Sequence, residues 1–150
     1  AIANAKPVVA VLDFELRDLT VLPGSAAELE RTASLRAMLE AALRAKGCDI
    51  AAITPGAQRE ANAGFGYLFD HHDSAAQLGR RFQADYVVIG RLHKPSYLFV
   101  YLMAHVVDVH RQNLTGDFLT EIKGTDARLT GKGVQGLSVK ITDKINCSGE

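Results

Sequence analysis

The stretch Val8-Val9-Ala10-Val11-Leu12 decides the fold class of this chain. It is a continuous apolar run that follows Pro7, and it is both rich in β-branched residues and too short for an independent helix. Such a run is typical of a central strand that is buried on both faces of a sheet. A second, nearly apolar run, Tyr86-Val87-Val88-Ile89, ends at Gly90 and predicts a strand beside the first.

The residues between these two runs predict two helices and a further strand. Residues 26–46 place apolar side chains at helical spacing and most charged ones off that stripe, which predicts an amphipathic helix that ends at Lys46-Gly47. Residues 48–53 predict a short strand, and a capping box of Ser74 and Gln77 predicts a helix over residues 75–83. We expect loops over residues 16–25 and 57–66, because both contain turn-forming glycines.

The last third of the chain predicts a hairpin and a final helix. Residues 97–109 and 114–122 form the expected hairpin, and residues 127–145 recover helical spacing. The order strand, helix, strand, helix, strand, strand, strand, helix predicts one α/β domain over residues 1–150. Its expected core is a single open mixed sheet of about five strands, parallel where a helix intervenes and antiparallel in the hairpin, with about three helices.

The composition indicates one compact domain and excludes several partners. The chain has 150 residues, of which 47% are hydrophobic and 23% charged, so it can build a core without a metal or a disulfide. Because 17 Lys and Arg balance 17 Asp and Glu, no global charge attracts nucleic acid or anionic lipid. No apolar run approaches the roughly 20 residues of a transmembrane helix. We therefore expect no nucleic-acid partner, no transmembrane segment and no cofactor.

Two cysteines and the first five residues give information on the cellular compartment of the protein. Cys48 and Cys147 do not have the spacing of zinc ligands. In an oxidising compartment they can pair, closing a loop of about 100 residues that would stabilise the fold by up to about 4.7 kcal/mol, whereas in the cytosol they would stay separate thiols. Residues 1–5, AIANA, have the small alternate residues of a signal-peptidase site, although they also suit a flexible end. We predict that the two cysteines are joined.

The segment from Gly64 to Asp73 is the candidate ligand-binding loop. Three aromatic residues at alternate positions precede two histidines that are flanked by carboxylates, and the glycines let a guest approach the backbone. Histidine and carboxylate ligands suit a transition metal, with a further ligand from His93, His105 or His110. The alternative is a structural plug, in which the aromatic rings pack onto the core. The candidate ligand-binding residues are Phe65, Tyr67, Phe69, Asp70, His71 and His72.

Carboxylates also follow the first strand. Asp13, Glu15 and Asp18 lie where open α/β sheets place ligands, so they can hold a cation or act in acid–base chemistry. The alternative, which we favour, is that they are solvated groups leading into a loop. We identify no catalytic residue, because the chain has no nucleophile elbow, P-loop or dinucleotide fingerprint.

The candidate interface is an aromatic stripe. Tyr97, Phe99 and Tyr101 lie two residues apart, on one face of the strand expected over residues 97–109. Such a strand is either covered on both faces or presents its stripe to a partner. Because three helices must cover two faces, we predict that the hairpin from Tyr97 to Ile122 forms part of a contact surface for a second copy or for an envelope protein.

Three segments of the sequence together suggest a family: VVAVLDFELRDLT at residues 8–20, RRFQADYVVIGRLHK at 80–94 and VVDVHRQN at 106–113. In these strand cores and in the order of its elements the chain resembles the TolB amino-terminal and CsgG-like group of bacterial envelope proteins. It departs from that group at residues 108–113, which lack the usual turn glycine, and in the aromatic insert at 64–72. The most similar proteins are small secreted ones that open with VLDFEL, some associated with quinone-dependent alcohol oxidation.

The resemblance implies a periplasmic location and a role in binding or assembly, and it transfers no catalytic residue. The first functional hypothesis is therefore a non-enzymatic periplasmic binding or assembly domain. The second is a small-ligand or metal-binding protein that uses residues 65–73. A hydrolase is the weakest hypothesis, because no recognisable set of nucleophile, base and orienting group is present.

Overall fold

The computed structural model describes residues 6–148, so the alanine-rich residues 1–5 lie outside the described residues. The strands are β1 (Val8–Val11), β2 (Glu15–Asp18), β3 (Asp49–Ala51), β4 (Tyr86–Lys94), β5 (Val100–Asp108) and β6 (Asn113–Ile122). The helices are α1 (Ala26–Ala45), α2 (Pro55–Ala61), α3 (Tyr67–Asp70), α4 (His72–Arg81) and α5 (Ala127–Lys144).

The predicted single open mixed sheet is confirmed. Within the described residues it has six strands, in the order β3-β1-β4-β5-β6, with β2 also paired to β4. The strands β3, β1, β2 and β4 pair in parallel, and β4, β5 and β6 pair antiparallel, with a bulge at Thr115 of β6, opposite Val106 and Val107 of β5. Parallel pairing therefore occurs where helices intervene, as expected.

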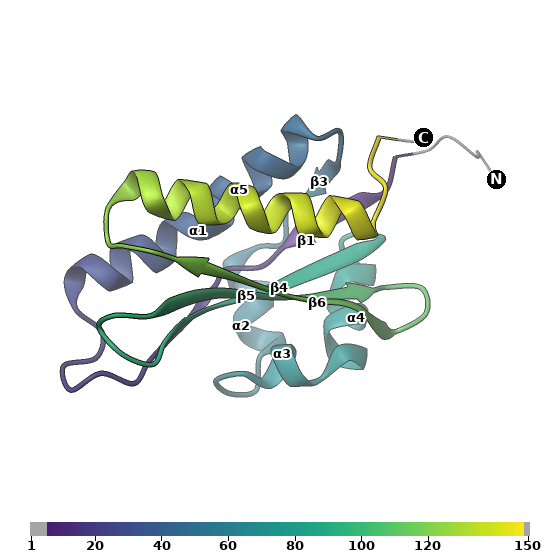
Figure 1. Ribbon diagram of the computed structural model, residues 1–150. Coiled ribbons are helices and arrows are strands. Elements are labelled where there is room, and N and C mark those ends of the chain that lie inside the picture. The colour runs from purple at the N-terminus through teal and green to yellow at the C-terminus, as the bar shows by residue number, and fades with distance from the viewer. Residues whose placement is uncertain (1–5, 149–150) are drawn as a thin grey trace.

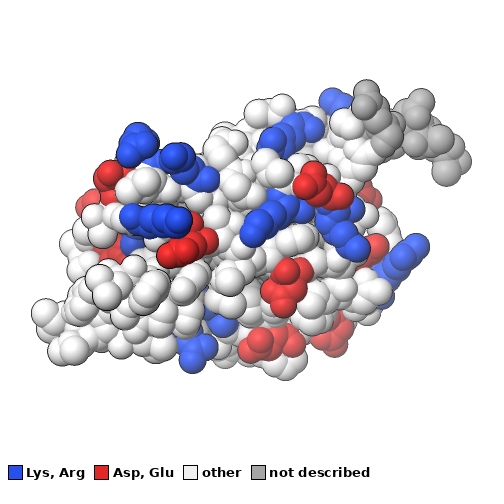
Figure 2. Space-filling view, in the orientation of Figure 1, with Lys and Arg blue, Asp and Glu red and all other residues white. Residues whose placement is uncertain are grey.

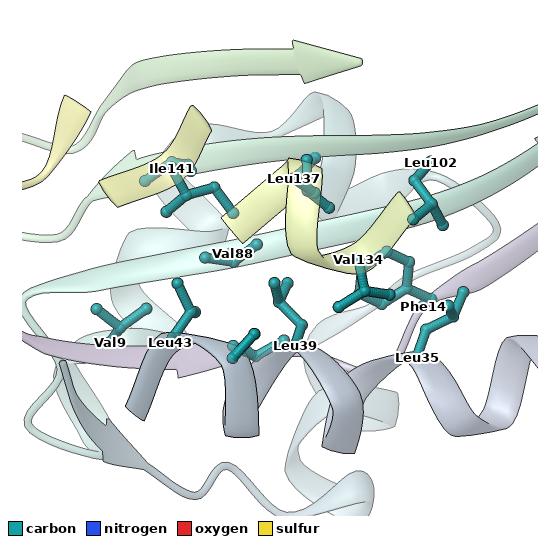
Figure 3. Close-up of a cluster of buried hydrophobic side chains, with 14 of the residues drawn as sticks. Val9, Phe14, Leu35, Leu39, Leu43, Val88, Leu102, Val134, Leu137 and Ile141 are labelled. Carbon is teal, nitrogen blue, oxygen red and sulfur yellow. The ribbon is translucent and has the colours of Figure 1, made fainter. Parts of the chain in front are cut away.

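Helices cover both faces of this sheet (Figure 1). Apolar residues at spacings of three and four place Leu35, Leu39 and Leu43 of α1 on one side of the helix, and Val134 and Leu137 of α5 do the same. These side chains are buried against the sheet and form the larger part of the core (Figure 3). The short helices α2, α3 and α4 pack on the opposite face, against the first half of β4 and the end of β5.

β2 is the strand that the sequence analysis missed, since it lies in the expected loop over residues 16–25. It runs beside the second half of β4, while β1 runs beside the first half. Between β1 and β2, the side-chain amide of Gln58 accepts a hydrogen bond from the Asp13 N–H at 2.8 Å and donates one to the Asp13 carbonyl at 3.0 Å. A side chain from α2 therefore satisfies the backbone where the strand pairing is interrupted.

Other boundaries also differ from expectation. The expected loop over residues 57–66 contains most of α2, which starts with Thr54 as its N-cap and Pro55 in its first turn. The expected helix over residues 75–83 begins earlier, at His72, so the capping-box interpretation of Ser74 is wrong. β4 continues through Gly90 to Lys94, and β5 begins only at Val100.

The predicted disulfide is present. Cys48 precedes β3, Cys147 follows α5, and their sulfur atoms lie 2.07 Å apart. The neighbouring Gly47 has φ +97°, and an added Cβ there would lie 3.2 Å from the Cys147 carbonyl oxygen. Gly47 thus permits both the left-handed turn that ends α1 and the close approach of the C-terminal segment.

Candidate functional site

The expected ligand loop is partly helical. Gly66, with φ +76°, precedes the single turn of α3. Because helical residues turn by about 100° each, the aromatic side chains do not form one wall. Phe69 is buried, Tyr67 is half-buried and Phe65 is 59% exposed. Phe69 therefore fills the core as the plug interpretation expects, and Phe65 remains accessible.

The two histidines of this segment point to different neighbours. His71 donates from Nδ1 to the Tyr67 carbonyl at 2.7 Å, and its ring stacks on Tyr67 with centroids 4.0 Å apart. His72 instead meets the edge of His105, at 5.7 Å between centroids, and Asp70 is exposed. Within residues 6–148, no group of three or more His, Cys, Asp or Glu is arranged to hold a metal ion.

His105 attaches α3 to the sheet. It donates from Nδ1 to the Phe69 carbonyl at 2.7 Å, and the two rings stack with centroids 3.6 Å apart. The other histidines lie elsewhere: His93 stacks on Tyr101 at 6.4 Å, and His110 pairs with Asp85 at 2.8 Å. Of the three further candidate ligands, the structure therefore places His105 beside the loop and His93 and His110 away from it.

The carboxylates after β1 have structural partners. Asp13 lies 3.4 Å from Arg36, and both Glu15 carboxylate oxygens accept a hydrogen bond from the Gly66 N–H at 3.1 Å. Asp18 organises the following loop by accepting hydrogen bonds from the Thr20 and Gly24 N–H groups. Burial raises the pKa of Asp18, but the hydrogen bonds from the Thr20 hydroxyl and from these two N–H groups, with the charge of Lys94, outweigh burial and lower the pKa from its ordinary value.

Arg91 is a feature that the sequence analysis missed. It lies on β4, is only 7% exposed, and places its guanidinium carbon 4.2 Å from the Phe69 ring centroid and 5.3 Å from that of Phe65. In the sequence it is an ordinary strand residue. Only the alternation of side chains along β4 indicates that it lies on the same face as Ile89 and His93.

The molecule carries a cluster of exposed apolar side chains at one end, which we call the tip. It is formed by the loop between β2 and α1 and the loop between β4 and β5, which lie side by side (Figure 1). The Tyr97 hydroxyl joins the loops by accepting a hydrogen bond from the Leu22 N–H at 3.4 Å. The tip residues are Leu19 (56% exposed), Val21 (88%), Leu22 (76%), Tyr97 (61%), Leu98 (83%) and Phe99 (47%).

The tip contains no charged side chain. Residues 19–25 and 95–99 lack Lys, Arg, Asp and Glu. Figure 2 shows the corresponding end of the molecule as an uncharged area at the lower left, in contrast to the mixed charges over the rest of this view. Groups of exposed apolar side chains are typical of surfaces that contact a partner.

The predicted aromatic stripe on a strand is wrong for two of its three residues. Tyr97 and Phe99 precede β5 and belong to the tip, whereas Tyr101 lies on β5 and is half-buried. The Ser96 hydroxyl accepts hydrogen bonds from the Leu98 and Phe99 N–H groups at 3.2 and 3.3 Å, so this backbone turns instead of extending. The preceding Pro95 also lacks a donor for a ladder.

Buried charges lie beneath the tip. Glu28 of α1 lies 3.0 Å from Lys94 at the end of β4 and 2.6 Å from Arg31. Lys94 also lies 5.3 Å from the Tyr97 ring centroid, and Arg31 donates to the Gly124 carbonyl at 2.9 Å. These contacts hold the end of β4 in place, where the loop between β4 and β5 begins.

No helix within residues 6–148 combines the length and apolar character needed to cross a membrane.

Solved structures share this fold at low sequence identity. The PelC dodecamer from Paraburkholderia phytofirmans is 17% identical, with a TM-score of 0.58 over 98% of this chain and 91% of that chain. Lipoprotein GNA1162 from Neisseria meningitidis is 16% identical, with a TM-score of 0.55 over 93% of this chain and 99% of that chain. At these identities the likeness shows the fold alone.

TolB from Acinetobacter baumannii shares the fold as well. It is 12% identical, with a TM-score of 0.55 over 95% of this chain but only 29% of TolB. The predicted likeness to TolB is thus confirmed for the fold, while the likeness to CsgG-like proteins stays a prediction.

No curated protein sequence matches the chain. One family model matches residues 7–140, from the residue before β1 to the last quarter of α5, and its description is "protein of unknown function" (DUF3280, DUF2380). Because this match includes every strand of the sheet, the chain belongs to the DUF3280 family.

Proposed function

We propose that this chain is a non-enzymatic accessory domain of the periplasm that works through protein contact, and that a second copy of the chain binds at the tip. The observation that supports this proposal is the group of six large apolar side chains exposed on two adjoining loops. Burying such side chains releases about 25 cal/mol per Å² of apolar surface, and aromatic residues are enriched at interfaces.

Charge and structural likeness favour a second copy as the occupant. The formal net charge of the chain is zero, so copies do not repel one another at long range. The PelC structure, whose fold this chain shares, is a dodecamer. The disulfide and the fold shared with lipoprotein GNA1162 support an oxidising, periplasmic location. The finer association with quinone-dependent alcohol oxidation rests on the sequence resemblance alone.

Sedimentation velocity over a range of concentrations tests the proposal. The native protein should self-associate, and a variant with Tyr97→Ser, Leu98→Ser and Phe99→Ser should remain monomeric at the same concentrations. Because these side chains are exposed, their replacement should change the free energy of unfolding by less than about 0.5 kcal/mol each. The matched control is Val139→Ser, an exposed apolar residue of α5, which should leave association unchanged.

Tyr101→Ser separates the tip from the rest of the predicted stripe. Tyr101 is half-buried beside His93, so its loss should reduce stability more than association. A native protein that stays monomeric at every concentration contradicts self-association, and the tip would then serve a different envelope protein.

A further inference from the structure

One part of the sheet keeps half-buried and exposed side chains on the face that the short helices cover. On the face that carries α2, α3 and α4, the buried cluster includes Val87 and Ile89 of β4 and Val107 of β5. Beyond these residues, strand alternation and register place the following side chains on the same face, which we call the open face: Glu15, Arg17, Arg91, His93, Tyr101, Met103, His105, Asp117, Leu119 and Glu121. Leu119 is 49% exposed, so this face meets solvent.

Arg91 is a buried cation of the open face, and the carboxylates near it, Glu15 and Asp70, form no ion pair with it. It forms no ion pair with a residue of 6–148, and Nε is fully enclosed without a hydrogen-bond acceptor. Its contacts are with the rings of Phe69 and Phe65. Cation–π contacts offset only part of the cost of burying an ion. The fold therefore keeps a cation that it only partly compensates.

The nearest carboxylate in register is engaged elsewhere. Glu15 stands opposite Arg91 in the pairing of β2 with β4. Its two oxygens accept hydrogen bonds from the Gly66 N–H, and Oε2 also accepts one from Asn62 at 3.3 Å. Glu15 thus holds the turn before α3 instead of forming an ion pair with the guanidinium.

Further cationic groups lie on the same face as Arg91, and the Gly66 backbone and the Phe69 ring hold its guanidinium in place. Arg17 and His93 lie on the same face, and burial, with the charges of Arg17 and Arg91, lowers the pKa of His93. The backbone at Gly66 is so close that an added Cβ would lie 2.8 Å from Nη2 of Arg91. A guanidinium held against the Phe69 ring is preorganised, which reduces the entropic cost of binding.

We propose that Arg91 binds the carboxylate of a small ligand whose apolar or aromatic body lies against Phe65 on the open face. The terminal nitrogens of a guanidinium match the two oxygens of a carboxylate. Phe65, Met103 and Leu119 offer apolar contacts nearby, which suit a monoanion with an apolar body better than inorganic phosphate. This site is separate from the tip and does not depend on the proposed self-association.

Titration of the full chain with benzoate, followed by calorimetry and by amide chemical shifts, tests the site. Native protein should bind benzoate saturably, bind neutral benzamide at least about tenfold more weakly, and bind inorganic phosphate more weakly than benzoate, because a charge-assisted hydrogen bond contributes about 1.5–3 kcal/mol. The shifts should concentrate at residues 64–69 and 91–93.

Variants identify the residue responsible. Arg91→Met should abolish binding, and because it removes a buried charge that the fold only partly compensates, it should fold with unchanged or greater stability. Arg81→Met is the matched control, since Arg81 is an exposed arginine that lies 5.7 Å from the Phe82 ring, and it should leave binding unchanged. Tyr97→Ser should also leave binding unchanged, which separates this site from the tip.

Three results would overturn the proposal, and the first two need no variant. They are the absence of saturable benzoate binding by native protein, equal binding of benzoate and benzamide, and retention of native affinity by Arg91→Met. Tighter binding of phosphate than of benzoate would overturn the carboxylate assignment.

Discussion

Gly90 provides the space in which the ring of Phe14 lies. An added Cβ at Gly90 would lie 2.4 Å from carbon atoms of that ring, and Phe14 is buried between β1 and β2. In the sequence this glycine predicts the end of a strand, but β4 continues for four more residues. The missing side chain therefore serves close packing within the strand and does not terminate it.

We expect Gly90→Ala to destabilise the protein by about 1–3 kcal/mol, because overpacking forces Phe14 from its position. Urea unfolding followed by circular dichroism measures this change. Gly64→Ala is the control, since nothing lies within 4 Å of its added Cβ. Adding Phe14→Leu to Gly90→Ala should recover part of the loss. An unchanged urea midpoint for Gly90→Ala would show that Phe14 repacks freely.

At the scale of elements, buried ion pairs connect α1 to the end of β4. Glu28 is 4% exposed and contacts both Arg31 and Lys94, while the Ser25 hydroxyl caps the helix by accepting from the Glu28 N–H. Burial alone raises the pKa of Glu28, but hydrogen bonds and charges of Arg31 and Lys94 outweigh burial and hold this pKa below 4.5, its ordinary value. Ionised Glu28 therefore stabilises the native state.

We expect Glu28→Gln to reduce the free energy of unfolding at pH 7 by about 3–5 kcal/mol, because two buried cations lose their anion. The native pKa is below the unfolded one, so this contribution is present above pH 4.5 and is lost as the pH falls through the native pKa. Urea unfolding at several pH values should thus show the difference between native and Glu28→Gln shrinking in acid. The exposed Glu30→Gln is the control. A difference that does not depend on pH would contradict this account.

At the scale of the whole molecule, the disulfide connects two distant parts of the chain. It joins residues 99 positions apart, so the covalent loop contains β3 to β6 and α2 to α5, whereas β1, β2 and α1 precede it. The loop-entropy model predicts that such a cross-link destabilises the unfolded state.

We expect the variant with Cys48→Ala and Cys147→Ala to keep the fold and to lose about 2–5 kcal/mol of stability. In urea unfolding, a thiol reductant should lower the midpoint of the native protein and leave the midpoint of the variant unchanged. A thiol assay on unfolded, unreduced native protein should detect no free thiol. Detection of two thiols would show that the cysteines are separate in solution.

Local patterns in the sequence predicted most of the elements. The apolar runs at Val8 and Tyr86 are strands of the sheet, and the helical spacing at residues 26–46 and 127–145 agrees with α1 and α5 within a residue or two. These predictions succeeded because an element that buries one or both faces must show this in its own residues. The cysteine pairing was also predicted correctly, from the positions of Cys48 and Cys147 relative to their elements.

Tertiary structure decided the features that depend on distant neighbours. β2 has the polar sequence ELRD and is a strand because the second half of β4 offers it backbone partners. Tyr97 was predicted as a strand residue and lies in the tip because Ser96 turns the backbone. Arg91 meets Phe65 and Phe69 because the Gly66 turn places α3 over β4. The sequence by itself determined which segments bury apolar surface, because the apolar pattern of a segment is a local property. Only the fold decided which side chains remain exposed or unpaired, because exposure and pairing depend on what the rest of the chain covers.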